Sequence, residues 1–304
     1  NFAKAVELAG LTFIGPKSEA IALMGSKSVS KKKMIEAKVP CIPGYQGDDQ
    51  SDNTLLKSAK KIGFPLMIKA SAGGGGRGMR LVNQVDDLKD ALKIARAEAL
   101  NAFGSSELIL EKAFVNARHI EIQIISDAYG SHLYFGERDC SIQRRHQKVI
   151  EESPSPVMTK MLREKMGKAA VCAAKAVDYT NAGTIEFLVD DQLNYYFLEM
   201  NTRIQVEHPV TEMVTGYDLI ALQFLVAQGA KLPMKQSDIA ITGHAIEARM
   251  YAEDPNNDFL PNAGKIDFWD PPRFDGMRID DGVVTGQTLS TFYDPMIAKF
   301  VGFG

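Results

Sequence analysis

The chain has 304 residues, of which 45% are hydrophobic and 24% charged, so it is globular rather than disordered, collagen-like or a coiled-coil rod. Its 35 basic and 38 acidic residues leave a net charge of −3, which creates no general attraction for nucleic acid or anionic lipid. The three cysteines have no CxxC spacing and indicate a reducing compartment. No apolar stretch is long enough to cross a bilayer. We therefore expect neither nucleic acid nor a membrane as a partner.

The first forty residues predict helices separated by stop signals. A short helix over Phe2–Ala9 is followed by Gly10, and Leu11–Ile14 has the composition of a strand. A lysine-rich helix should start at Ser26 and end near Lys38, because a proline at position 40 disfavours helical geometry in the residue before it. Pro40–Gly47, rich in proline and glycine, predicts a connector between domains.

The next segment alternates helices with strands. A helix from Ser51/Asp52 to Ile62 is stopped by glycine. The hydrophobic patterns then predict strands over 64–70, 79–82 and 108–111 and a long helix over 86–103. From residue 114 onward, strands over 120–124 and 132–137, a helix over 161–177, a hairpin of 183–189 with 195–201 and a helix over 211–228 follow. Hairpins mixed with helices favour the α+β class.

A loop of glycines joins the strands over 64–70 and 79–82. Gly73-x-Gly75-x-x-Gly78 matches the dinucleotide fingerprint as a string, but a strand follows it where that fingerprint needs a helix. No Lys-Ser/Thr follows, so it is not a P-loop either. Such a loop can still bring backbone N–H groups close to phosphates, with Lys69 as an added cation. We favour this reading over a flexible hairpin tip.

The predicted hairpin of 183–189 with 195–201 opposes two carboxylates. With a two-residue turn at Gln192-Leu193, Glu186 faces Glu199 directly. Opposed like charges destabilise a sheet unless a cation lies between them. Mg²⁺ or Mn²⁺ suits such oxygen ligands, which favours a metal site over a solvated polar face in another register.

Polar residues continue at every second position beyond this hairpin. Glu199, Asn201, Arg203, Gln205 and Glu207 would share one face of an extended strand. Five functional groups in line indicate a site rather than a solvated face. We therefore expect this strand to run to His208-Pro209.

A basic segment, Gln143–Lys148, has three possible interpretations. It could contact nucleic acid, form a surface turn, or provide a pocket for phosphate or bicarbonate. The net negative charge of the chain fits the anion pocket better than nucleic acid.

Three strings together resemble the ATP-grasp biotin carboxylase component of biotin-dependent acyl-CoA carboxylases of the acetyl-, propionyl- or methylcrotonyl-CoA type. They are Lys69–Arg80, Glu137–Lys148 and Glu199–Glu212, and the similarity covers essentially the whole chain. The resemblance implies an α+β ATP-grasp fold with a small glycine-loop lid and a larger mixed-sheet domain. The boundaries expected from it are a remnant of a Rossmann-like N-terminal domain at 1–13, linker helices at 14–40, the lid at 41–113, and the core with a truncated C-terminal domain at 114–304.

The resemblance also implies a reaction. ATP would phosphorylate bicarbonate, and the carboxyphosphate so formed would carboxylate biotin attached to a carrier domain. Mg²⁺ or Mn²⁺ would be held by Glu186, Glu199 and Asn201. The nucleotide would be bound by a larger set, namely Lys27, Lys69, Gly74, Gly75, Gly76, Glu111, Lys112, Phe114, His119, Gln143 and His146.

The remaining roles follow from the same resemblance. Lys148 and Arg203 would bind bicarbonate, with Gln205 and Val206 alongside. Glu207 would act as the general base that deprotonates it. Arg249 would stabilise the anion of biotin.

The expected partners are a biotin carboxyl carrier domain, a carboxyltransferase subunit and, at full length, a second copy. The compartment would be the bacterial cytoplasm or the mitochondrial matrix. The chain lacks an initiator Met, so we expect it to be a piece of a longer protein. Two other functions stay open: an ATP-grasp carboxylate–amine ligase, and a nucleotide-binding or subunit-contact module without chemistry of its own.

Overall fold

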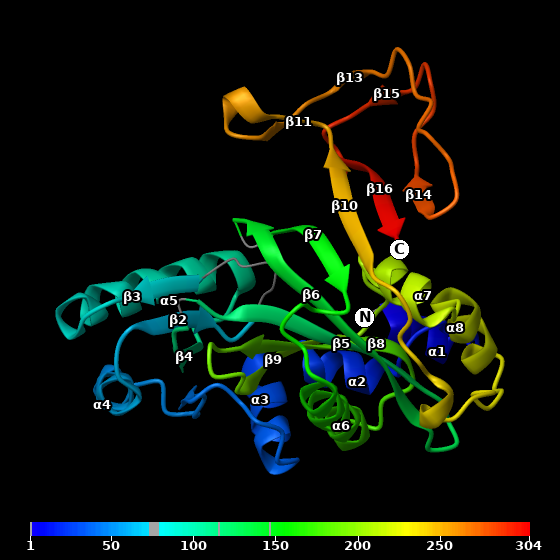
Figure 1. Ribbon diagram of the computed structural model, residues 1–304. Helices are drawn as coiled ribbons and strands as arrows, with labels where there is room; N and C mark the ends of the chain where they lie inside the picture. Colours follow the sequence, from blue (N-terminus) through cyan, green and yellow to red (C-terminus); the bar gives the residue numbers. More distant parts are fainter. Residues whose placement is uncertain (1, 73–78, 115, 146) are drawn as a thin grey trace.

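The computed structural model describes residues 2–72, 79–114, 116–145 and 147–304, and its two large sheets are covered by helices (Figure 1). The smaller sheet has four strands in the order β1-β4-β2-β3. The larger has eight in the order β14-β16-β10-β7-β6-β5-β8-β9. All neighbouring strands in both sheets pair antiparallel, which confirms the α+β class.

Three helices open the chain: α1 (Phe2–Leu8), α2 (Ser18–Met24) and α3 (Lys27–Glu36). The predicted helix from Ser26 is confirmed, since the Ser26 hydroxyl accepts a hydrogen bond from the Val29 amide. The predicted strand over 11–14 is wrong. Leu11 and Ile14 are exposed, because this apolar segment packs against no sheet.

The smaller sheet and its helices form a unit close to that expected. The unit consists of β1 (Gly44–Tyr45), α4 (Asp52–Ile62), β2 (Leu66–Ala70), β3 (Met79–Val82), a 3₁₀ turn η1 (Val85–Asp87), α5 (Leu88–Phe103) and β4 (Leu108–Lys112). Ser51 caps α4 by accepting from the Thr54 amide, and Gly63 ends the helix at φ +84°. Leu55, Ile68 and Leu110 are fully buried in its apolar core.

The larger sheet occupies the rest of the chain. Its strands are β5 (Arg118–Ser126), β6 (His132–Arg144), β7 (Gln147–Ser153), β8 (Asn181–Val189), β9 (Tyr195–Asn201), β10 (Ala245–Tyr251), β14 (Met277–Asp281) and β16 (Met296–Phe303). A segment that projects away from the sheet at the top of Figure 1 carries β11 (Glu253–Asp254), η3 (Pro255–Asn257), β12 (Leu260–Pro261), β13 (Gly264–Lys265) and β15 (Thr288–Leu289). The turn η2 (Gln236–Asp238) precedes β10.

The two faces of β5 are both buried but differ in chemistry. Ile120, Ile122 and Ile124 pack with α6 (Lys160–Ala176) in the main apolar core. Glu121 and Gln123, which alternate with them, are equally buried on the other face. The alternation in this strand therefore separates an apolar core from a buried polar one.

The helix expected over 211–228 is wrong as a single element. The structure has α7 (His208–Thr215) and α8 (Leu219–Ala227), which meet at 97°. Gly216 ends α7 at φ +73°, and the Asp218 side chain caps α8 by accepting from the Ala221 amide. In the described part of the chain no single helix is long and apolar enough to span a membrane, although this bent pair passes that test when its two helices are taken together.

Candidate active site

A cavity of about 670 Å³ lies between the smaller sheet and the polar face of the larger one. Every predicted site residue that the structure describes lines it: Lys27, Lys69, Glu111, Lys112, Phe114, His119, Gln143, Lys148, Glu186, Glu199, Asn201, Arg203, Gln205, Val206, Glu207 and Arg249. Gly74, Gly75, Gly76 and His146 lie outside the described residues. The structure thus brings the described residues together from both sheets and from α3.

The hairpin of β8 and β9 brings Glu186 opposite Glu199 as predicted, but by a different turn and register than expected. Glu186 pairs directly with Glu199, as predicted. The two-residue turn is wrong, because Val189 pairs with Tyr195 and leaves 190–194 as the loop. A register shift between Glu186 and Phe187 restores the predicted pairing.

The predicted strand over 199–207 ends early. β9 stops at Asn201, and the chain is irregular until α7 begins at His208. Gln205 and Asn201 nevertheless reach the same atom, since their side-chain amides donate to Glu186 Oε1 at 3.0 and 2.7 Å. Arg203 is exposed and donates to Asn201 Oδ1 at 3.3 Å. The predicted gathering of these polar side chains is confirmed, although an irregular turn after β9 rather than a continuous strand produces it.

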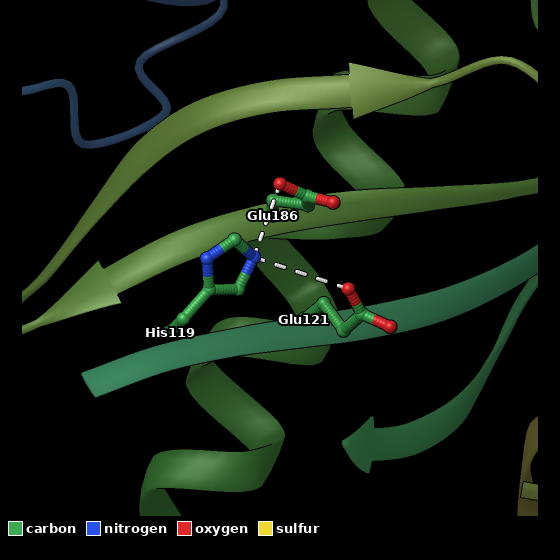
Figure 2. A group of neighbouring side chains, drawn as sticks. All are labelled: His119, Glu121 and Glu186. Carbon is green, nitrogen blue, oxygen red and sulfur yellow. Dashed lines mark ion pairs between the residues drawn. The ribbon is translucent and has the colours of Figure 1, made fainter. Parts of the chain in front are cut away.

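Glu186 lies at the centre of a cluster of possible metal donors. Figure 2 shows the His119 ring pointing toward Glu186 and Glu121, with His119 Nε2 at 3.0 Å from Glu186 Oε2. These three residues offer donor atoms within 4.8 Å of one another. Although burial opposes it, His119 and Lys148 hold the pKa of Glu186 far below its ordinary value. Burial and the charge of Glu186 raise the pKa of Glu199.

Lys148 connects the carboxylates of this site. Its Nζ lies 2.5 Å from Glu121 Oε2, 2.6 Å from Glu207 Oε1 and 3.0 Å from Glu186 Oε1. Burial disfavours a charged lysine, but these carboxylates raise its pKa well above the ordinary value. The three carboxylates therefore favour the charged form of Lys148.

Arg249 reaches Glu207 from the other side. Its Nη2 lies 3.0 Å from Glu207 Oε2, while its Nε donates to Glu151 Oε1 at 2.7 Å. Burial opposes ionisation here too, but Glu151 and Glu207 raise the pKa of Arg249. Each oxygen of Glu207 thus faces a different cation.

A buried arginine behind the site was not predicted. Arg138 is fully buried, and its Nε donates to Glu121 Oε1 at 2.5 Å. Its other nitrogens donate to Gln123, Thr184, Gln205 and Thr211. The strict alternation of β5, which places Glu121 and Gln123 opposite the isoleucines, was the signal that could have identified this buried polar face.

The end of the cavity next to the smaller sheet is basic. Lys69 and Lys31 each contact one oxygen of Glu111, both at 2.6 Å. Burial opposes the ionisation of Glu111, but the two lysines lower its pKa. Lys31 was not predicted. Burial lowers the pKa of Lys27, which also lines the cavity.

The remaining predicted residues flank the mouth of this end. The Phe114 ring stacks on Tyr196 with centroids 5.0 Å apart. Lys112 Nζ donates to the Phe64 carbonyl at 3.0 Å, and Gln143 Nε2 donates to the Cys140 carbonyl at 2.7 Å.

The basic segment divides between the site and the surface. Lys148 points into the cavity. Arg144 instead pairs with Glu253 at 2.6 Å and lies over the Phe259 ring, while Arg145 pairs with Asp258. One end of the segment therefore lines the cavity, while the other lies at the surface as the surface-turn interpretation expects; an anion pocket stays a prediction.

Two protein-family models match the chain. One describes the ATP-binding domain of the carbamoyl-phosphate synthase L chain and matches residues 26–235, and the other describes the biotin carboxylase C-terminal domain and matches 247–304. Biotin carboxylase 1 of Bacillus subtilis is 48% identical over 305 residues, which cover 100% of this chain and 68% of that protein. The chain belongs to the biotin carboxylase family.

Other members of the biotin carboxylase family extend the comparison. The mitochondrial methylcrotonoyl-CoA carboxylase subunit alpha of Dictyostelium discoideum is 52% identical over 302 residues, which are 99% of this chain but 43% of that protein. A crystal structure of biotin carboxylase from Campylobacter jejuni in an ATP-type complex matches with TM-score 0.96 and 46% identity over 100% of this chain and 68% of its own.

A second solved structure was determined with ligands. It is the biotin carboxylase domain dimer of 2-oxoglutarate carboxylase from Hydrogenobacter thermophilus, in complex with MgADP, ADP and bicarbonate. The TM-score is 0.95 at 45% identity, over 100% of this chain and 67% of that one. The fold is thus the ATP-grasp fold of biotin carboxylases, as the resemblance implied.

Proposed function

We propose that this chain carries out the ATP-dependent carboxylation of biotin by bicarbonate, the first half-reaction of a biotin-dependent acyl-CoA carboxylase. The observation that carries the proposal is the position of Glu207 in the cavity wall, with Lys148 on one carboxylate oxygen and Arg249 on the other. In this arrangement a general base lies beside two cations, one of which can bind the anionic substrate bicarbonate and the other the anion of biotin.

The basic end of the cavity would bind ATP. Lys27 and Lys69 would hold its phosphates, while Phe114 and the β4 residues Glu111 and Lys112 would contact the adenine. Because two lysines contact the side chain of Glu111, we propose that the backbone of Glu111 contacts the adenine. We place Gln143 at the ribose, and we keep Gly74–Gly76 and His146 as further proposed contacts.

The opposed carboxylates Glu186 and Glu199, with Asn201, would hold Mg²⁺ or Mn²⁺. Their oxygen donors fit such a hard cation. Burial and the facing charge of Glu186 raise the pKa of Glu199, and a cation between the two carboxylates would offset that repulsion. When bound, the metal would neutralise the phosphoryl group during its transfer. His119 and Lys148 already contact Glu186, so they would adjust as the cation enters.

Bicarbonate would bind beside Glu207. Lys148 and Arg203 supply positive charge, and Gln205 and Val206 line the same wall. Glu207 would accept the proton of bicarbonate, so that its oxygen attacks the γ-phosphorus of ATP and ADP leaves. Carboxyphosphate would then break down to CO₂ and phosphate, and the phosphate would accept the proton of N1′ of biotin. Arg249 would stabilise the biotin anion that forms, and its N1′ would attack the CO₂.

The proposed setting follows from the named relatives. Because these include alpha subunits of acyl-CoA carboxylases, we propose a biotin carboxyl carrier domain and a carboxyltransferase subunit as partners. The dimer in the Hydrogenobacter structure supports a homodimer at full length. Eukaryotic relatives are named mitochondrial, so the matrix is proposed for a eukaryotic source and the cytoplasm for a bacterial one. Domain boundaries near residues 13, 40 and 113 remain a proposal.

The test is release of ADP from MgATP, measured on the intact protein with and without bicarbonate and free biotin. Release should require bicarbonate and increase with biotin. Glu207→Gln should lower it by about 10²–10⁴-fold, the usual effect of removing a general base. Glu164→Gln, which changes an exposed carboxylate on α6, should leave it unchanged.

Three outcomes would contradict the proposal. Full bicarbonate-dependent release by Glu207→Gln would exclude Glu207 as the base. Release that ignores biotin but responds to an amine would move the assignment to a carboxylate–amine ligase, and binding of MgATP without any release would leave a nucleotide-binding module.

A further inference from the structure

A second pair of carboxylates faces each other behind Arg249. Glu151 on β7 and Glu247 on β10 are directly paired across the two strands, and both are fully buried. In the described part of the structure, both oxygens of Glu247 and Oε2 of Glu151 have no hydrogen-bond partner. Two opposed buried carboxylates would repel strongly if both were ionised.

The cations nearby do not balance this pair. Arg249, two residues along β10, donates to Glu151 Oε1 and also contacts Glu207 Oε2. Lys299 of β16 lies opposite Arg249, but its Nζ donates to the Val206 carbonyl and lies 3.2 Å from Asp280. Glu207, which precedes α7, adds a further negative charge. Among the residues that the structure describes, no cation forms an ion pair with Glu247.

We propose that Glu247 is a positioning residue for Arg249, and that Glu247 acts by staying protonated. With Glu247 neutral, Glu151 is the only anion of the pair. Its Oε1 lies 2.7 Å from Arg249 Nε and 2.5 Å from Arg249 Nη2, and the same Nη2 lies 3.0 Å from Glu207 Oε2, so one anion on each side holds the guanidinium between them. The inference rests on the proposed function, because its consequence for turnover depends on Arg249 acting at biotin.

Loss of the proton would alter this arrangement. Arg249 already contacts Glu151 by two nitrogens, and a second buried anion at Glu247 would draw it further from Glu207 and toward the Glu151–Glu247 pair. The surroundings favour the neutral form, since burial, with the charge of Glu151, raises the pKa of Glu247 to about 8. Burial also raises the pKa of Glu151 to about 7, although Arg249 opposes this. Between about pH 7 and 8, Glu151 is ionised and Glu247 is neutral, so Arg249 should be held in place there and displaced once Glu247 ionises above pH 8.

The first experiment detects the proton without measuring turnover. Infrared difference spectra of the intact protein, recorded as a function of pH, should contain the C=O stretch of a protonated carboxylic acid that disappears as the pH rises through about 8. Glu247→Gln should lack this signal. Glu152→Gln is the matched control, because Glu152 is the next residue on β7, is partly exposed and pairs with His244. It should keep the signal.

The second experiment measures turnover. Biotin-dependent ADP release should fall about tenfold per pH unit once Glu247 ionises, as for any single required proton. Glu247→Gln should retain the rate above pH 8, while Glu152→Gln should fall like the original protein. ADP release measured without biotin should not show this fall above pH 8.

The two experiments separate the inference from the proposed function. An alkaline fall that persists in Glu247→Gln, a carboxylic-acid signal unaffected by that variant, or a metal ion found bound to the pair would overturn the positioning role. A signal that behaves as expected in a protein without biotin-dependent turnover would support the protonated Glu247 and overturn the proposed function instead.

Discussion

The two large sheets bury their central strands to the same depth but with different chemistry. In the smaller sheet, Ile68 and Leu110 lie in an apolar core between helices. In the larger sheet, one face of β5 is apolar, and the other presents Glu121 to Arg138 and Lys148. Burial alone therefore does not distinguish a structural core from a site. The chemical difference predicts how each sheet responds to substitution.

The polar face should be the less tolerant of the two. A buried charge is costly once its partner is removed, because the remaining group cannot return to water. An apolar core loses contact energy in proportion to the atoms removed.

Replacing Arg138 with Met should give the largest effect. It leaves Glu121 Oε1 and the side chains of Gln123, Thr184, Gln205 and Thr211 without their buried donor. We expect a loss of about 3–5 kcal/mol in the free energy of unfolding, measured by urea titration. Arg80→Met in the smaller sheet, where a partly exposed pair with Glu98 is lost, should cost less than about 1 kcal/mol. Equal losses would contradict the comparison.

Glu247→Gln should stabilise the protein in a pH-dependent way. The folded-state pKa of Glu247 is raised from 4.5 to about 8, so the folded state keeps a proton that the unfolded state has released. Its contribution to stability is present below pH 4.5 and is lost as the pH rises to about 8. The advantage of Glu247→Gln should thus grow by about 1.4 kcal/mol per pH unit in that window and then level off. Urea titrations at several pH values measure it, and an advantage independent of pH would show that Glu247 is already ionised in the fold.

Ile68→Val should give a small change that does not depend on pH. It removes one methylene group from the apolar core of the smaller sheet and should cost about 0.5–1.5 kcal/mol. The loss should be the same from pH 5 to pH 9, because neither the side chain nor its apolar neighbours titrate. A marked pH dependence in urea titrations would mean that the two sheets are not energetically distinct in the way proposed.

Local signals in the sequence accounted for most of the secondary structure. Ser51 and Gly63 bound α4 as expected, because capping and positive φ depend on neighbouring residues alone. The strand predicted over 11–14 and the continuation predicted beyond Asn201, over 202–207, were wrong because a strand also needs a partner, which the local pattern does not reveal. The prediction of one helix over 211–228 was wrong because Gly216 adopts a helix-ending conformation, although the residues on either side of it are apolar.

By itself, the sequence determined the α+β class, the family, the opposition of Glu186 and Glu199, and the described residues that line the cavity. Only the tertiary structure decided which cation contacts each carboxylate. Glu151 meets Glu247 because the order of strands in the larger sheet brings β7 next to β10. A hairpin register follows from residues close in sequence, whereas the pairing of β7 with β10 depends on the packing of the whole sheet.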